Sequence, residues 1–171
     1  MPGRQYASVR VSVTKALAAA GNYAAEDVLS ESATDGAGTA WTFANAAPSG
    51  GSGYIVGATA LLETTALTPR ITLYLFNATP TSELDDNAAN TAVIHADASK
   101  YIGRIDFDAL QDLGGDSEAV ATPSTSGNLP MKFVLAAGAT SLFGIAVTRD
   151  AITGENATDD LVITLFIEQD L

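Results

Sequence analysis

Alternation of apolar and polar positions is the strongest pattern in the sequence, and it predicts β-strands along most of the chain. Residues 70–76 alternate strictly, which is the period of a half-buried strand. A longer apolar run at 54–62 precedes them, after a Gly/Ser loop at 50–53 and before a break at Thr68-Pro69. We therefore expect residues 54–62 and 70–76 to form two adjacent antiparallel strands, around which the rest of the chain is organised.

The same strand period recurs in other parts of the sequence. Val9, Val11 and Val13 alternate with polar residues, and Trp41 and Phe43 share one face, which we expect to point inward. Further strands are expected at residues 26–30, 40–44, 101–107, 129–135, 141–148 and 161–167. The expected non-strand segments are surface loops at 109–127 and 149–160 and a helical turn at 83–87 with Ser82 as its N-cap.

About eight or nine strands with almost no helix predict an all-β fold, an antiparallel β-sandwich of the jelly-roll-like kind. Long loops at 77–99 and 109–128 favour Greek-key or jelly-roll connections over a meander. The length of 171 residues fits a single domain spanning 1–171. The chain has no cysteine, so disulfides and thiolate metal sites are excluded.

The charge of the chain is strongly acidic and unevenly distributed. The net charge is −12, which disfavours a nucleic-acid partner, and no apolar run is long enough to span a membrane as a helix. Arg4, Arg10 and Lys15 are the only charged residues before Glu26, so the first 25 residues carry +3 and the remaining 146 carry −15. Residues 1–25 are a candidate arm that docks on an acidic partner. The alternative is an ordinary first strand with solvated basic side chains.

Few residues suggest catalysis or metal binding. His95 lies near Asp97 and Ser99, but no nucleophile-elbow sequence accompanies them, and a surface histidine is the simpler interpretation. Asp106 and Asp108 are paired carboxylates of the kind that hydrolyse glycosides, or a solvated strand end. Acidic clusters at 83–87 and 150–160 offer oxygen ligands for Ca²⁺, or are solvated loops. We assign no catalytic, cofactor-binding or metal-binding residue, and expect neither a cofactor nor an enzyme.

Several short segments, spread over most of the chain, occur together in one known family. They are Tyr-Ala-Ala-Glu-Asp-Val-Leu at 23–29, Gly-Gly-Ser-Gly-Tyr-Ile-Val at 50–56, Leu-Tyr-Leu-Phe at 73–76, Asp-Asn at 86–87, Tyr-Ile-Gly-Arg-Ile-Asp-Phe at 101–107 and Leu-Phe-Gly at 142–144. With the terminal strand, they resemble a family of tailed-bacteriophage virion structural proteins. The resemblance implies a β-sandwich protein of the virion, encoded near the head genes.

Two functions follow as expectations. The first is a capsid decoration or cement protein, a homotrimer on the outer surface of the virion, whose partners are the major capsid protein and copies of itself. Arg4, Arg10 and Lys15 would then make the capsid or subunit contacts. The second is a tail- or fibre-associated carbohydrate- or receptor-binding module, which would use exposed aromatics such as Tyr54 or Tyr74.

Overall fold

The computed structural model describes residues 6–18, 21–64, 66–124, 128–156 and 158–170. These residues form thirteen strands and one short 3₁₀ helix, η1. In chain order the elements are β1 (Tyr6–Ala16), β2 (Gly21–Tyr23), β3 (Val28–Leu29), β4 (Trp41–Phe43), β5 (Ser52–Leu62), β6 (Ile71–Phe76), η1 (His95–Asp97), β7 (Tyr101–Phe107), β8 (Gln111–Asp112), β9 (Ser117–Ala121), β10 (Met131–Val134), β11 (Leu142–Thr148), β12 (Ile152–Glu155) and β13 (Asp160–Asp170). No described helix is long and apolar enough to cross a membrane.

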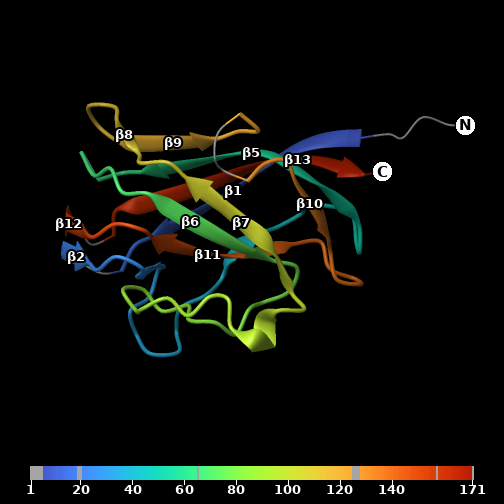
Figure 1. Ribbon diagram of the computed structural model, residues 1–171, viewed down its shortest axis with the longest axis horizontal. Helices are drawn as coiled ribbons and strands as arrows, with labels where there is room; N and C mark the ends of the chain where they lie inside the picture. The colour runs from blue at the N-terminus through green and yellow to red at the C-terminus, as the bar shows by residue number, and fades with distance from the viewer. Residues whose placement is uncertain (1–5, 19–20, 65, 125–127, 157, 171) are drawn as a thin grey trace, which may run out of the picture.

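Two antiparallel sheets stack to form a sandwich, which confirms the expected fold class. The six-stranded sheet has the order β1-β13-β5-β9-β8, with β10 also paired to β5. The five-stranded sheet has the order β3-β11-β6-β7, with β4 also paired to β11, and β12 and β2 form a separate ribbon. Figure 1 shows the two layers crossing at an angle. Their inner faces share one hydrophobic core, and Trp41 and Phe43 are buried in it as expected.

The pairing of the strands is that of a jelly roll. The first long strand, β1, pairs with the last, β13. Of the next strands inward, β3 and β4 both pair with β11. Further inward, β5 pairs with β9 and β10, and β6 pairs with β7. Successive nested pairs alternate between the two sheets. The chain is thus one long antiparallel hairpin wound around a core, which is the double Greek key of the jelly roll.

The expected pairing of the two central strands is wrong. β5 lies in the six-stranded sheet and pairs with β13, β9 and β10, whereas β6 lies in the opposite sheet and pairs with β11 and β7. The connection at 63–70 therefore crosses from one sheet to the other and does not close a hairpin. Stacked sheets are about 10 Å apart, a distance that a few extended residues can span. Local turn chemistry identified both strands but could not specify their partners.

Three segments differ from their expected secondary structure. The expected loop at 109–127 contains β8 and β9, a hairpin that turns at Gly114 with φ +86°. The expected acidic loop at 149–160 contains β12. Residues 83–87 form no helix, so Ser82 is not an N-cap, and its side chain is buried. Of the candidate arm at 1–25, residues 6–16 and 21–23 are paired strands.

Candidate functional site

The outer face of the five-stranded sheet is covered by residues 77–100, which we call the cover segment. Its ends meet where the Asn77 N–H donates to the Lys100 carbonyl, at 2.9 Å. The packed side chains are Leu84, Ala92 and Val93 from the cover segment and Val28, Tyr74, Phe76, Phe143, Ile145 and Val147 from the strands. Figure 1 shows this segment, green to yellow, beneath β6 and β11. All six residues of β6 are consequently buried, and the expected half-buried strand is wrong.

A buried aspartate, Asp97, holds the cover segment together. Its carboxylate accepts hydrogen bonds at 2.8–2.9 Å from the backbone N–H and the hydroxyl of both Thr81 and Ser82. The Lys100 ammonium lies 3.0 Å from the same carboxylate. Burial alone would raise the pKa of Asp97, but Lys100 and the surrounding donors hold that pKa well below its ordinary value. Asp97 is therefore an ionised group that organises a loop.

The candidate catalytic groups do not converge. His95 is exposed on η1, whereas Asp97, two residues on, is buried and bound to other partners. Asp106 pairs with Arg104 at 3.1 Å on the surface of β7, and Asp108 is exposed beyond the end of the strand. These contacts give each group a structural or solvated environment.

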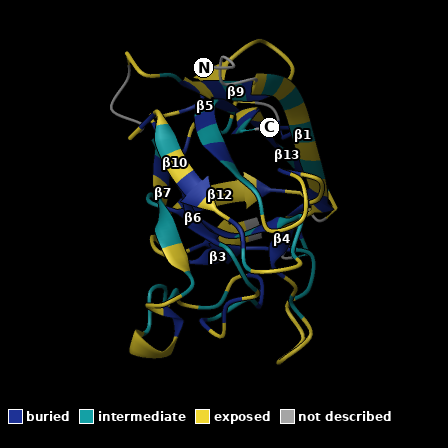
Figure 2. Cartoon of the chain, turned by 90° about the vertical axis from the view of Figure 1, so that its right-hand side faces the viewer, coloured by how far each residue is buried: buried dark blue, intermediate teal, exposed yellow. Residues whose placement is uncertain are grey.

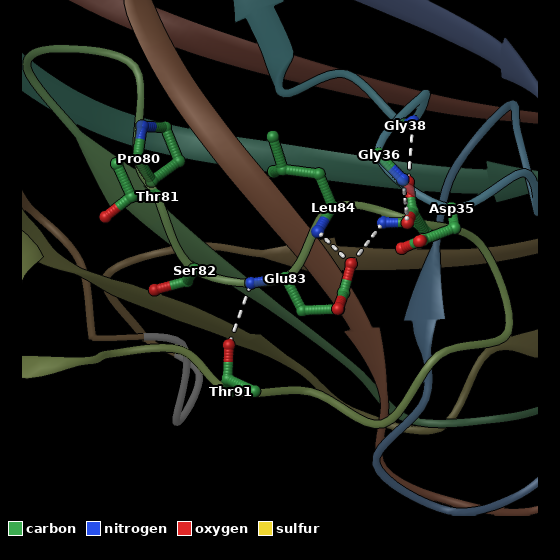
Figure 3. Close-up of a pocket in the computed structure, with 10 residues that line it drawn as sticks. Asp35, Gly36, Gly38, Pro80, Thr81, Ser82, Glu83, Leu84 and Thr91 are labelled. Atoms are coloured by element: carbon green, nitrogen blue, oxygen red, sulfur yellow. Dashed lines mark hydrogen bonds between the residues drawn. The ribbon is translucent and has the colours of Figure 1, made fainter.

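A polar hollow of about 360 Å³ opens between the loop before β4 and the cover segment (Figure 3). The carboxylates at its rim bind backbone N–H groups. Asp85 accepts hydrogen bonds from Gly38 and Gly36 at 2.7 Å each, and these N–H groups lower its pKa. Glu83 accepts from the N–H groups of Leu84 and Asp85 at 2.9 Å. Within the described ranges, no three Asp, Glu or His side chains gather as ligands for a metal ion.

The second acidic cluster, at 150–160, is also dispersed. Asp150 binds Arg70 at 2.6 Å, and Asp159 accepts a hydrogen bond from Asn156 at 3.1 Å. Glu155 differs from them because it is 3% exposed and neither carboxylate oxygen has a hydrogen-bond partner among the described residues. Burial, with repulsion from Asp159 and Asp86, raises the pKa of Glu155 to about 7.

In contrast to the covered sheet, the six-stranded sheet leaves its outer face open. We call the outer face of β1, β13, β5 and β9 the open face. Its central side chains are neutral, and all but the buried Thr164 are at least partly exposed: Ser12, Val56, Thr59, Leu61, Val120, Val162, Thr164 and Phe166. Charged side chains on this face, such as Arg10, Glu118 and Glu168, lie toward its margins. The chain therefore presents a sheet face of hydroxyl and apolar groups with little charge at its centre.

Phe166 is the largest apolar side chain on the open face, and it is 37% exposed. It lies opposite Gly57 of β5, and a Cβ added at Gly57 would meet the ring at 3.3 Å. The Arg10 guanidinium lies over the ring, 5.9 Å from its centroid, and a hollow of about 320 Å³ adjoins them. Val120, 48% exposed, adds a second apolar group on β9. The strand expected at residues 161–167 is present, but its apolar run gave no sign that Phe166 points outward.

The structure describes two of the three predicted contact residues and places them in different surroundings. Arg4 lies outside the described residues. Arg10 is exposed on the open face. Lys15 is only 7% exposed, because it points into the sandwich, pairs with Glu31, and lies over the Trp41 ring at 5.6 Å from the centroid. Its charge is neutralised inside the protein, which leaves Arg10 as the described member of the predicted set that can reach a partner.

The two aromatic residues proposed for carbohydrate binding also differ. Tyr74 is 8% exposed beneath the cover segment, so the expectation that it is exposed is wrong. Tyr54 is partly exposed on β5, and the Lys132 ammonium lies 5.1 Å from its ring centroid. Tyr54 alone of the pair offers a surface to a sugar.

Comparisons with known proteins give little further guidance. Neither a protein-family model nor a curated protein matches the sequence. Among solved structures, the chain is similar to the decameric BFDV capsid protein, at 13% sequence identity, over 98% of this chain and 100% of that chain. The TM-score is 0.32, and a likeness at this level carries no argument. The assignment of the fold rests on the strand pairing itself.

Proposed function

We propose that the chain is a structural protein of a virus particle, specifically a decoration protein on the outer capsid of a tailed bacteriophage. The observation that carries this proposal is the difference between the two outer faces of the sandwich. One is filled by the cover segment, and the other is left open, with a neutral centre and an exposed Phe166. Apolar and neutral surface of this kind is typical of the core of a protein–protein interface.

The charge of the molecule is consistent with a place outside the shell. The net charge is −12, so a position against packaged nucleic acid would be electrostatically unfavourable. The open face carries Arg10, and its carboxylates, such as Glu118 and Glu168, lie toward the margins and not at the centre. The partner proposed for this face is the major capsid protein, whose repeated subunits would bind many copies and stabilise the shell by mass action.

Binding to capsids tests the proposal. Expanded, empty capsids of the phage that carries this gene should bind the purified protein, and Phe166→Glu should abolish binding without unfolding the chain. Tyr101→Glu is the matched control, because Tyr101 is also 37% exposed but lies on β7, in the opposite sheet. Equal binding by both variants, or electron microscopy that places the protein on the tail, would contradict the proposal.

A tail- or fibre-associated carbohydrate-binding module is the second candidate, and Tyr54 is the observation in its favour. A partly exposed aromatic ring beside a cation can stack on a sugar and hydrogen-bond its hydroxyls. A glycan array probed with the isolated protein should then give a signal that Tyr54→Ala removes and Phe166→Glu retains. The absence of any glycan signal would eliminate this candidate.

A further inference from the structure

The first strand, β1, forms a long free edge of the six-stranded sheet. It pairs with β13 through eleven consecutive residues without a register shift, and no strand of the described residues pairs with its other side. Figure 2 shows β1 at the margin of the sheet, with exposed and partly buried residues alternating along it. Beyond Lys15 the edge closes, because Lys15 binds Thr39 and the Ala18 N–H donates to the Ser30 carbonyl. The free part is therefore residues 6–14.

The backbone groups along this edge can be assigned. In an antiparallel pair, alternate residues turn both backbone groups toward the partner strand, and the residues between them turn theirs away. The Leu17 N–H donates to the Asp159 carbonyl at 3.0 Å in the β1–β13 register, so the odd-numbered residues of β1 bond to β13. Within residues 6–14, the residues that direct their backbone N–H and C=O groups outward are therefore Tyr6, Ser8, Arg10, Ser12 and Thr14. None of the five makes a backbone hydrogen bond to described residues outside the sheet.

This edge lacks the features that normally prevent pairing with another chain. Natural edge strands are interrupted by proline, by bulges or by several charges. Residues 6–14 contain no proline and no bulge, and Arg10 is their only charged residue. The inward-pointing side chains Val9, Val11 and Val13 pack against the core but are only partly buried. The edge thus leaves both backbone groups and apolar surface unpaired.

We propose that two copies of this chain pair antiparallel through β1, about a two-fold axis at Val11, and join their six-stranded sheets into one. Centred there, Arg10 lies opposite Ser12 of the second copy and Ser8 opposite Thr14, so no like charges are directly opposite, and the two Arg10 residues are diagonal neighbours about 7–8 Å apart. Val9 then faces Val13, and Val11 faces its own counterpart, which extends the apolar row across the axis. The interface is isologous and closed. It does not depend on what the open face binds.

A second copy is a better occupant of this edge than a foreign strand for an electrostatic reason. Each copy carries −12, so two copies repel one another over most of their surface. Residues 6–14 contain no carboxylate and carry one positive charge, which makes this edge a place where two such acidic molecules can meet. The strand is also complementary to itself in the proposed register, whereas a foreign partner would need a matching segment.

Single cysteines test the register, because the native sequence has none. Val11 faces its counterpart in a non-hydrogen-bonded pair, where the Cα atoms are about 4.5 Å apart, within the range that a disulfide spans. Val11→Cys should therefore form a covalent dimer under mild oxidation. Val13→Cys is the matched control, because its counterpart lies about 13 Å away, four residues along the strand. Cross-linking at residue 13 as readily as at residue 11, or at neither, would overturn the proposal.

Charge substitutions at Ser12 test the pairing without a covalent bond. Ser12→Lys places a cation opposite Arg10 twice in the interface and should weaken the dimer roughly 2- to 30-fold, and Ser12→Glu should strengthen it by a similar factor. If only the net charge of this acidic protein mattered, Ser12→Lys would strengthen the dimer by reducing repulsion, and Ser12→Glu would weaken it. Ser99→Lys and Ser99→Glu, at an exposed position in the cover segment, report that general effect.

Sedimentation velocity over a concentration series measures the association of all four variants and the native chain. The proposal requires a dimer whose stability follows the order Glu, Ser, Lys at position 12. A native chain that stays monomeric at millimolar concentration overturns it. So does a trimer, the state expected from the family resemblance, or a dimer that responds to Ser12 and Ser99 substitutions alike.

Discussion

Glu155 gives the sharpest expectation about stability, because a carboxylate is buried there without a partner. It ends β12, next to a bulge in the pairing of that strand with β2. The side chain is 3% exposed, and neither oxygen accepts a hydrogen bond from the part of the chain that the structure describes. Burial, together with the negative charges of Asp159 and Asp86, raises its pKa from 4.5 to about 7. The folded protein therefore binds a proton that the unfolded chain releases over this range of pH.

The sign and size of the effect follow from linkage. Below about pH 4.5 both states are protonated, and Glu155 makes no difference to the pH dependence. Between about pH 4.5 and pH 7 the unfolded chain has released a proton that the folded state keeps, so the free energy of unfolding falls by about 3 kcal/mol over this range and levels off above it. Glu31 behaves differently. Burial would raise its pKa, but Lys15 and neighbouring hydroxyls lower it to about 2, so its contribution is lost only in acid.

Glu155→Gln removes the titration while keeping the shape of the side chain. Urea unfolding at pH 5 and pH 8 gives the free energies. We expect the variant to be more stable than the native chain at pH 8 by about 2–3 kcal/mol, and close to it or slightly less stable at pH 5, since the amide is also unpaired. Glu168→Gln is the matched control, because Glu168 is exposed on β13. If the effect of Glu155→Gln is the same at both pH values, the carboxylate is not buried as described.

Three further predictions concern the interior. Asp97→Asn should destabilise the fold by about 2–4 kcal/mol and increase binding of an apolar dye, because the cover segment loses its anchor and exposes the sheet beneath. Lys15→Met should lower the free energy of unfolding in urea by about 2–3 kcal/mol, because Glu31 loses its cation. Arg70→Met breaks an exposed ion pair with Asp150 and should lower it by less than about 1 kcal/mol. Gly144→Ala should lower the free energy of unfolding by about 1–3 kcal/mol, since the added Cβ would lie 2.8 Å from a leucine side chain in the core. Unchanged unfolding curves in any of these variants would contradict the packing described.

The local period of the sequence predicted where most strands lie but not how they pair. The strands expected at 9–13, 70–76 and 101–107 are confirmed by β1, β6 and β7, although β6 is buried on both faces. The partners of β5 and β6 could not be predicted, because a turn that closes a hairpin and one that crosses between sheets use the same residues. Pairing in a jelly roll joins residues far apart in the chain, and β1 pairs with the last strand. Nothing in a short window of sequence specifies such contacts.

The exposure of two residues was predicted wrongly, although their positions in the alternation of inward and outward side chains indicated the correct answer. Lys15 has the same parity as Val9, Val11 and Val13, so the alternation places it on the inward face, but its charge suggested exposure. Tyr74 was placed on a solvated face. Phe76, of the same parity, is apolar as well, and two aromatics on one face are a signal that something covers it. Which segment covers that face depends on tertiary contacts, which the local alternation of the sequence does not specify.

The covering of only one face also explains why the other face is the better functional candidate. A sheet face that merely meets water is expected to alternate with charged and strongly polar side chains. Two neighbouring rows of paired residues cross β1, β13 and β5 on this face. One row is Ser12, Thr164 and Thr59, and the other is Thr14, Val162 and Leu61. In a chain with 20 acidic residues, a sheet centre without one is a departure that solvation does not explain. A surface that has to be desolvated against another protein would have this composition, because burying an unpaired carboxylate there would oppose binding.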